Sequence, residues 1–299
     1  MKLFCSQNRG KGFSCLLFFF ITASLFSNER NSPKRIVSLS PAATEILCAV
    51  GAYNEIVART DFCDFPPEVT VIPSVGGFDG KTLSLEKIIS FQPDFVYAVK
   101  GMHDHLVAPL EKLGIKVYVS DAKSISSIIT EIHTIGSITG HEKKAAETTA
   151  QIESLLLKVR DALQNEPAVT VYWEVWNAPY MTAGSSSFIN EVIKDAGGIN
   201  IFADIRQAYP VVSEESILAR DPKVIVLAKT SGIQLQDVAE RTGWQSVTAV
   251  RNKKIVIVDD TLTLRPGPRI AQAVLDLALS LHPRNAKLTA LKNLQENNK

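Results

Sequence analysis

One stretch of this chain occurs twice, and the duplication constrains the fold more than any other feature. Residues 83–98 read LSLEKIISFQPDFVYA, and residues 212–228 read VSEESILARDPKVIVLA. Each copy combines a short helical pattern, a proline break and an apolar, β-branched run, which is typical of a helix that leads into a strand. The chain is therefore predicted to contain two related α/β lobes. The matching positions are Ser84 with Ser213, Glu86 with Glu215, Ile88 with Ile217 and Pro93 with Pro222.

Each copy carries a glutamate at the equivalent place, Glu86 in the first and Glu215 in the second. Two equivalent acidic points on a pseudo-symmetric molecule suit a partner with two equivalent basic sockets, and such partners are commonly two-fold oligomers. The alternative is that both glutamates are simply solvated in the first turn of a helix, where the helix dipole favours acidic side chains. The spacing alone leaves both interpretations open.

Composition places the chain among ordinary globular proteins. Of its 299 residues, 45% are hydrophobic and 21% are charged, so one large or two medium domains with ample core are expected. The formal net charge of +1 gives no indication of a nucleic-acid surface. The sequence has no Walker A loop and no GxGxxG motif, so nucleotide binding has no motif support.

The first 27 residues have the layout of a secretory signal peptide. Lys2, Arg9 and Lys11 supply positive charge, residues 13–26 are mostly apolar, and small residues follow. The apolar run is too short for a comfortable membrane span, and no cysteine follows it that a lipid anchor would need. We therefore expect export to the periplasm after removal of residues 1–27, with an uncleaved anchor as the alternative.

Strand and helix patterns alternate from residue 34 onward, which favours a parallel sheet with right-handed crossovers. We assign an N-terminal α/β lobe to residues 34–140 and a C-terminal α/β lobe to residues 167–284. Between them, residues 141–166 contain one long helical pattern with apolar residues at i, i+3, i+4 and i+7, interpreted as an inter-lobe brace. The polar tail, residues 285–299, is expected to fray.

The expected strand-end loops carry aromatic, basic and glycine residues. In open α/β sheets, ligands gather outside the carboxyl ends of the strands, and pockets favour domain interfaces. Rings on these loops would make a wall for a large, flat, partly apolar ligand in a cleft between the lobes, although we expect about half of them to cap the lobe cores instead. The residues in question are Phe62, Phe65, Phe78, Lys100, Gly101, Trp176, Tyr180, Tyr209 and Arg265.

Two further features leave metal chemistry open. His103 and His105 form an H-x-H pair that could bind a transition metal if their loop were extended, although no third ligand is adjacent. Cys63 lies in a loop, where it could contact a soft metal, and is expected to be more exposed than Cys48, which reads as a small core residue. The two cysteines could also form a disulfide bridge.

The sequence lacks two common catalytic motifs. It contains neither a GxSxG nucleophile elbow nor an HExxH metal motif. The pair Asp259 and Asp260 ends a predicted strand without a partner histidine nearby in the sequence. We therefore do not expect an enzyme.

Several segments together resemble the substrate-binding proteins of ABC importers for vitamin B12 and ferric siderophores, nearest to the cobalamin-binding branch. The resemblance covers residues 34–284 and rests on RIVSLSPAATEIL, DFCDFPPEV, VGGFDG, SLEKIISFQPDFV, LGIKVYV, VSEESILARDPKVIV and RPGPRI. It implies two Rossmann-like lobes joined by a single long helix, a monomer without a cofactor, and delivery of the ligand to a dimeric membrane permease. Cobalamin or a related corrinoid is the first ligand that it implies, with a ferric siderophore or haem second and a zinc or other metal-ion binder of the same fold third.

The resemblance also implies residue roles. Glu86 and Glu215 match the glutamates that dock onto arginines of the permease, and Arg265 matches an arginine of the ligand cleft. Val99 stands where the cobalamin-binding branch has an aromatic residue, and the region around Trp176 does not align residue by residue. The expected ligand-binding residues are Phe62, Cys63, Phe65, Phe78, Lys100, Gly101, Trp176, Tyr209 and Arg265.

Overall fold

The computed structural model describes residues 32–77 and 82–297, and these contain two separate β-sheets. The first sheet has four parallel strands in the order β2-β1-β3-β4. The predicted export segment, residues 1–27, and the predicted ring of Phe78 lie outside the described residues. The strands are β1 (Ile36–Ser38), β2 (Ile56–Ala58), β3 (Phe95–Val99) and β4 (Lys116–Ser120).

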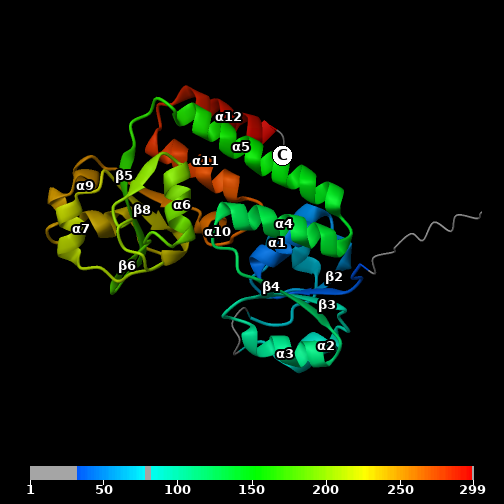
Figure 1. Ribbon diagram of the computed structural model, residues 1–299. Helices are drawn as coiled ribbons and strands as arrows, with labels where there is room; N and C mark the ends of the chain where they lie inside the picture. The colour runs from blue at the N-terminus through cyan, green and yellow to red at the C-terminus, as the bar shows by residue number, and fades with distance from the viewer. Residues whose placement is uncertain (1–31, 78–81, 298–299) are drawn as a thin grey trace, which may run out of the picture. The chain divides into compact units, whose positions relative to one another are not determined.

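Helices cover both faces of the first sheet, as Figure 1 shows, with α2 and α3 on one face and α1 and α4 on the other. Successive residues of β3 alternate between the two cores: Phe95 and Tyr97 belong to one apolar cluster, and Val96 belongs to the other. The helices are α1 (Pro41–Val50), α2 (Leu85–Ser90), α3 (Asp104–Lys112) and α4 (Ile125–Thr139), with short 3₁₀ turns η1 (Tyr53–Glu55) and η2 (Pro67–Val71).

Local sequence explains where these helices begin and end. The Ser40 hydroxyl accepts the Ala43 amide at the start of α1, and Ser124 caps α4 in the same way through the amide of Ser127. Gly51 ends α1 with φ of 94°, a left-handed conformation that a glycine adopts without steric cost. A serine before the first turn and a glycine after the last one therefore set the ends of α1.

The second sheet is mostly parallel and runs β6-β5-β8-β9, with β7 also paired to β5. Only β6 is antiparallel among the described strands, and the sequence patterns did not reveal this short strand. The strands are β5 (Val169–Asn177), β6 (Tyr180–Thr182), β7 (Gly198–Asn200), β8 (Val224–Ala228) and β9 (Ile255–Val258). The helices are α6 (Phe188–Asp195), α7 (Glu214–Arg220), α8 (Leu235–Ala239), α9 (Thr248–Arg251), α10 (Asp260–Thr263) and α11 (Ile270–Leu281), with 3₁₀ turns η3 (Lys229–Ser231) and η4 (Trp244–Ser246).

The long helix α5 (Glu142–Leu163) lies within the segment 141–166 that was assigned to the inter-lobe brace. Its buried face belongs to one core that includes residues of both sheets. The Thr148 hydroxyl donates to the Ala49 carbonyl at the end of α1, 2.9 Å away. A second link is independent of α5, because the Ile125 amide of α4 donates to the Glu191 carboxylate of α6 at 2.8 Å. The two α/β halves are therefore held by shared core and hydrogen bonds as well as by the connecting helix.

The described part of the C-terminal tail is helical, which corrects the prediction that the tail frays. Residues Ala286–Asn297 form helix α12, which packs beside α5 and α11. The Asn285 amide donates to the Ala162 carbonyl at 2.9 Å, and Lys292 pairs with Asp276 at 2.7 Å. Leu288 is fully buried and Leu291 packs partly buried against the same core, so two leucines in a polar segment attach the helix to the core. No helix in the described ranges is long and apolar enough to cross a membrane.

Substitution of the α12 anchor tests this packing. The change Leu288→Ala should lower the free energy of unfolding by about 2–4 kcal/mol, because it leaves a cavity in the core. The matched change Leu294→Ala on the same helix, where the side chain is 57% exposed, should cost less than about 0.5 kcal/mol. Urea denaturation measures both. Equal, small losses would show that α12 does not pack on the core in solution.

Candidate functional site

A cavity of about 400 Å³ lies at the carboxyl end of the first sheet. Its wall is formed by the residues that follow β1, β3 and β4 and by Phe62 from the loop after β2. The opposite part comes from the far end of the chain, where residues 264–266 connect α10 to α11. This is the edge at which ligands of open α/β sheets gather, so the position agrees with the predicted cleft.

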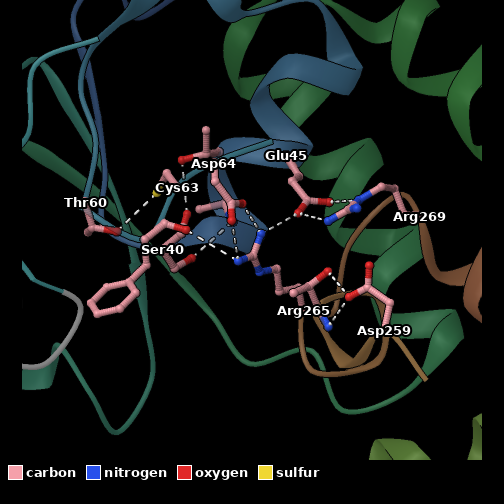
Figure 2. A network of polar contacts seen from close by, with 12 residues as sticks. Ser40, Glu45, Thr60, Cys63, Asp64, Asp259, Arg265 and Arg269 are labelled. Carbon is pink, nitrogen blue, oxygen red and sulfur yellow. Dashed lines mark hydrogen bonds and ion pairs between the residues drawn. The ribbon is translucent and has the colours of Figure 1, made fainter. Parts of the chain in front are cut away.

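A network of two arginines and two carboxylates borders this cavity (Figure 2). Glu45 of α1 is only 2% exposed and receives two hydrogen bonds from Arg269, at 2.6 and 2.7 Å. Arg265 donates to Asp64 at 2.5 Å and reaches Glu45 at 3.5 Å. The hydrogen bond from Arg265 holds the pKa of Asp64 below its usual value. Two guanidinium groups thus face two carboxylates, and the charges balance.

Of these four residues, only Arg265 was predicted in the cleft; Glu45, Asp64 and Arg269 were missed. The available signal was a lone acidic residue in the otherwise apolar helix PAATEILCAV. A buried carboxylate requires a partner, but nothing local identifies arginines more than 200 positions away.

A second charged cluster lies on the cavity wall, at the ends of β3 and β4. The Lys100 ammonium lies 2.7 Å from one oxygen of Asp121, and the Lys123 ammonium lies 2.9 Å from the other. The hydrogen bonds from both lysines lower the pKa of Asp121, and the bond to Asp121 raises the pKa of Lys100. Gly101 turns the chain after Lys100 with φ of 79°. Lys100 was predicted as a site residue, whereas Asp121 and Lys123 were missed.

The predicted aromatic residues do not all meet at the cavity. Phe62 is 59% exposed and lines it. Phe65 instead lies beneath Arg269, with the guanidinium carbon 4.0 Å from the ring centroid, which is a cation–π contact. Trp176 is 51% exposed and its indole N–H donates to the Ala178 carbonyl, whereas Tyr209 lies in the loop before α7. Neither Trp176 nor Tyr209 is among the residues that line the cavity.

Tyr180 is also placed away from the cavity. It belongs to β6 and packs its ring against Trp244, with centroids 5.8 Å apart. It is one of the rings that cover a lobe core rather than the cleft.

The structure corrects two expectations about Cys63 and the histidine pair. Cys63 is buried rather than exposed, and its thiol shares a hydrogen bond with the Thr60 hydroxyl at 3.1 Å, while Cys48 is the less buried of the two. Burial raises the pKa of Cys48 to about 12, and neither cysteine forms a disulfide. The Cys63 amide donates to the Thr60 carbonyl, so Cys63 lies in a tight turn. The composition of the loop does not show that this turn buries the thiol.

The His103 and His105 side chains do not point to one side. Their segment is not extended, because α3 begins at Asp104, and His103 is buried with Nδ1 accepting the Val99 amide at 3.0 Å. His105 is exposed in the first turn of that helix. Within residues 32–77 and 82–297, no group of three histidine, cysteine or acidic side chains is placed to hold a metal ion.

The two copies of the repeat have equivalent structures. Ser84 caps α2 through the Lys87 amide, and Ser213 caps α7 through the Ser216 amide. Glu86 and Glu215 both lie exposed in the first turn of their helix, and hydrogen bonds to the α7 backbone and Ser213 lower the pKa of Glu215.

The glutamate next to Glu215 behaves differently. Glu214 accepts the indole N–H of Trp244 at 2.5 Å and the hydroxyl of Tyr180 at 3.3 Å. Its carboxylate is therefore directed into the lobe, where it fixes α7 to the neighbouring turn. Of the two consecutive glutamates, Glu215 is the one whose side chain is exposed to solvent.

Comparison with known proteins identifies relatives along most of the chain. A family model described as periplasmic binding protein matches residues 36–262. An uncharacterized ABC transporter substrate-binding lipoprotein of Bacillus subtilis is 32% identical over 281 residues, which cover 90% of this chain and 88% of the relative.

Two solved structures are also similar. The periplasmic vitamin B12-binding protein of Vibrio cholerae has a TM-score of 0.72 and 26% identity, covering 84% of this chain and 97% of the relative. A periplasmic heme-binding protein from Roseiflexus, in its apo form, has a TM-score of 0.74 and 25% identity, covering 84% and 98%.

Neutralising the buried carboxylate tests the arginine network. The change Glu45→Gln should reduce the free energy of unfolding by about 3 kcal/mol, because two arginines lose their shared buried partner. Glu153→Gln, on the exposed side of α5, serves as the control and should stay within about 0.5 kcal/mol of the original protein. Both values come from urea denaturation. An unchanged stability in Glu45→Gln would mean that the network does not support the fold.

Proposed function

The chain belongs to the periplasmic binding protein family, and we propose that it captures cobalamin or a related corrinoid and delivers it to an ABC permease. As a substrate-binding component of an ABC importer, the protein is a transport protein rather than an enzyme. Proteins of this family carry no cofactor, because the bound compound is the transported ligand.

One observation supports a ligand with an apolar face: the cavity at the carboxyl end of the first sheet is walled by Phe62, Leu264 and Pro266. Phe62 is 59% exposed, so an apolar ligand face that covered its ring would remove a large unfavourable contact with water. The exposed ammonium groups of Lys100 and Lys123 on the same wall supply polar contacts. The resemblance to the cobalamin-binding branch, and the similarity to the Vibrio cholerae vitamin B12-binding protein, select a corrinoid as the first candidate.

Haem is the second candidate, and the similarity to the Roseiflexus heme-binding protein favours it. Haem is also large, flat and apolar on both faces, so it suits the same aromatic wall. A ferric siderophore remains the related alternative from the sequence. The metal-ion alternative has lost its main support, because His103 is buried and His105 is exposed.

Location and partners complete the proposal. Residues 1–27 direct the chain across the cytoplasmic membrane, and the protein acts as a monomer in the periplasm. Capture needs little rearrangement, because α5 and the shared core permit only a modest hinge closure. The loaded protein then docks onto the permease through Glu86 and Glu215, where opposite charge sets orientation and encounter rate more than affinity.

Ligand titration is the first test. Calorimetry and visible spectroscopy of the purified protein should show one-to-one binding of cyanocobalamin, and Phe62→Ala should weaken that binding about tenfold or more by removing an aromatic contact. The control Leu157→Ala removes an exposed apolar side chain on α5 and should leave the affinity unchanged. Binding of haemin without binding of cyanocobalamin would replace the corrinoid by haem.

Charge reversal tests the docking surface separately. The double change Glu86→Lys and Glu215→Lys should abolish uptake of labelled cobalamin by cells, because it opposes basic sockets, while the affinity for cobalamin stays the same. The control pair, Glu111→Lys and Glu153→Lys, reverses two exposed charges outside the repeat and should preserve uptake. An equal fall of affinity and uptake in the Glu86 and Glu215 variant would place these residues in the ligand pocket.

A further inference from the structure

The cationic side chains on the cavity wall differ in how many of their hydrogen-bond donors are free to contact a ligand. Arg265, which the sequence predicted as a ligand contact, is only 16% exposed and directs its guanidinium at Asp64 and Glu45. The same Arg265 also approaches the Phe62 carbonyl at 3.5 Å. Its planar fork of donors is therefore occupied within the protein, and the neighbouring pair of Glu45 and Arg269 is equally balanced (Figure 2).

The lysine cluster on the same wall is not balanced in this way. Two ammonium groups, from Lys100 and Lys123, share the single carboxylate of Asp121. Each ammonium carries three donors, and its ion pair with Asp121 occupies one of them. The side chains of Lys100 and Lys123 are 60% and 73% exposed, so the remaining donors can reach a ligand.

The surroundings of the cluster add two further carboxylates, Asp104 and Glu131. Asp104 is close enough to contribute to the raised pKa of Lys100, but it accepts the Gly101 amide at 2.9 Å and does not line the cavity. Asp121 and Ala122 also border an adjoining hollow of about 430 Å³, where Glu131 lies together with Ser126, Ser127 and Thr130; Glu131 does not line the cavity that holds Phe62. On the cavity side, the wall therefore presents cationic donors next to the apolar surface of Phe62.

We propose that Lys100 and Lys123, held in place by Asp121, form an anion-recognition point that selects ligands with a phosphate or carboxylate group at their edge. The inference rests on the proposed function, because it concerns the ligand of the same cavity. Asp121 positions the lysines by holding two flexible side chains at the ends of neighbouring strands. An anionic group would take the free ammonium donors in charge-assisted hydrogen bonds, while the rest of the ligand covers Phe62.

Two ligand classes carry such a group. Cobalamin has a phosphodiester in its nucleotide loop, and dicyanocobinamide keeps the corrin ring but lacks that loop and its phosphate. Haemin has two negatively charged propionate carboxylates. In its dimethyl ester both are esterified and carry no charge. Each pair therefore compares a ligand that has the anionic group with one that lacks it, and the two pairs distinguish phosphate from carboxylate.

The decisive experiment measures these pairs against the double variant Lys100→Met and Lys123→Met. For cyanocobalamin we expect about a 3- to 10-fold loss of affinity at low salt, and a smaller loss at high salt, because the charges are exposed and screened. For dicyanocobinamide we expect no change. Lys158→Met, which removes an exposed lysine on α5, is the matched control and should change neither affinity.

A second variant, which is expected to tighten binding instead of weakening it, separates anion recognition from a structural role of the cluster. Asp121→Asn removes the negative charge that competes with the ligand but keeps a side-chain oxygen that accepts from a lysine, so it should tighten cyanocobalamin binding at low salt and leave dicyanocobinamide unaffected. Weaker binding of both corrinoids in the lysine variant and in Asp121→Asn would overturn the proposal, since the cluster would then only support the loop.

The original protein provides the separate check on the proposed function. If it binds neither corrinoid, the corrinoid assignment fails, and the same variants are titrated with haemin and haemin dimethyl ester. A loss restricted to haemin then supports the anion-recognition point with carboxylate as its ligand group. Equal affinities for the charged and uncharged member of whichever pair binds would overturn it.

Discussion

A buried carboxylate, Glu45, links the two lobes of this chain. Glu45 lies inside α1 in the first lobe, and its partners Arg265 and Arg269 come from the segment that leads into α11. Removing such a carboxylate from water costs several kcal/mol, so it is tolerated only where hydrogen bonds from cations replace the lost hydration. The requirement brings residues 264–266 against the carboxyl end of the first sheet, and the cavity exists because those segments meet there.

The same constraint orders the loop after β2. Asp64 takes the other donors of Arg265, and the Phe65 ring lies under Arg269, so the loop is attached at two neighbouring points. Phe62, between these contacts and β2, is thereby presented to the cavity. Because the arginines are already paired with Glu45 and Asp64, the anion recognition that we propose involves Lys100 and Lys123 instead.

The internal repeat is symmetric in its backbone and asymmetric in its side chains. Both copies begin with a serine cap and continue from helix into strand, which a short sequence comparison reveals because capping and periodicity are local. The second copy carries an additional glutamate, Glu214, which serves Trp244 and Tyr180 within the lobe. Equivalent positions in a repeat therefore need not share a role, and the neighbours in space decide which glutamate faces outward.

The sequence by itself determined the α/β class, the two lobes, the long helix and the presence of Phe62, Lys100 and Arg265 at the cavity, because caps, apolar periods and strand ends are properties of neighbouring residues. It did not reveal that Cys63 and His103 are buried, that Leu288 anchors a terminal helix, or that Asp121 and Lys123 belong to the wall. Those facts depend on segments that meet only after folding. Tertiary structure alone decided which cations are already paired, since Glu45 finds its arginines 220 and 224 positions away, where no local pattern extends.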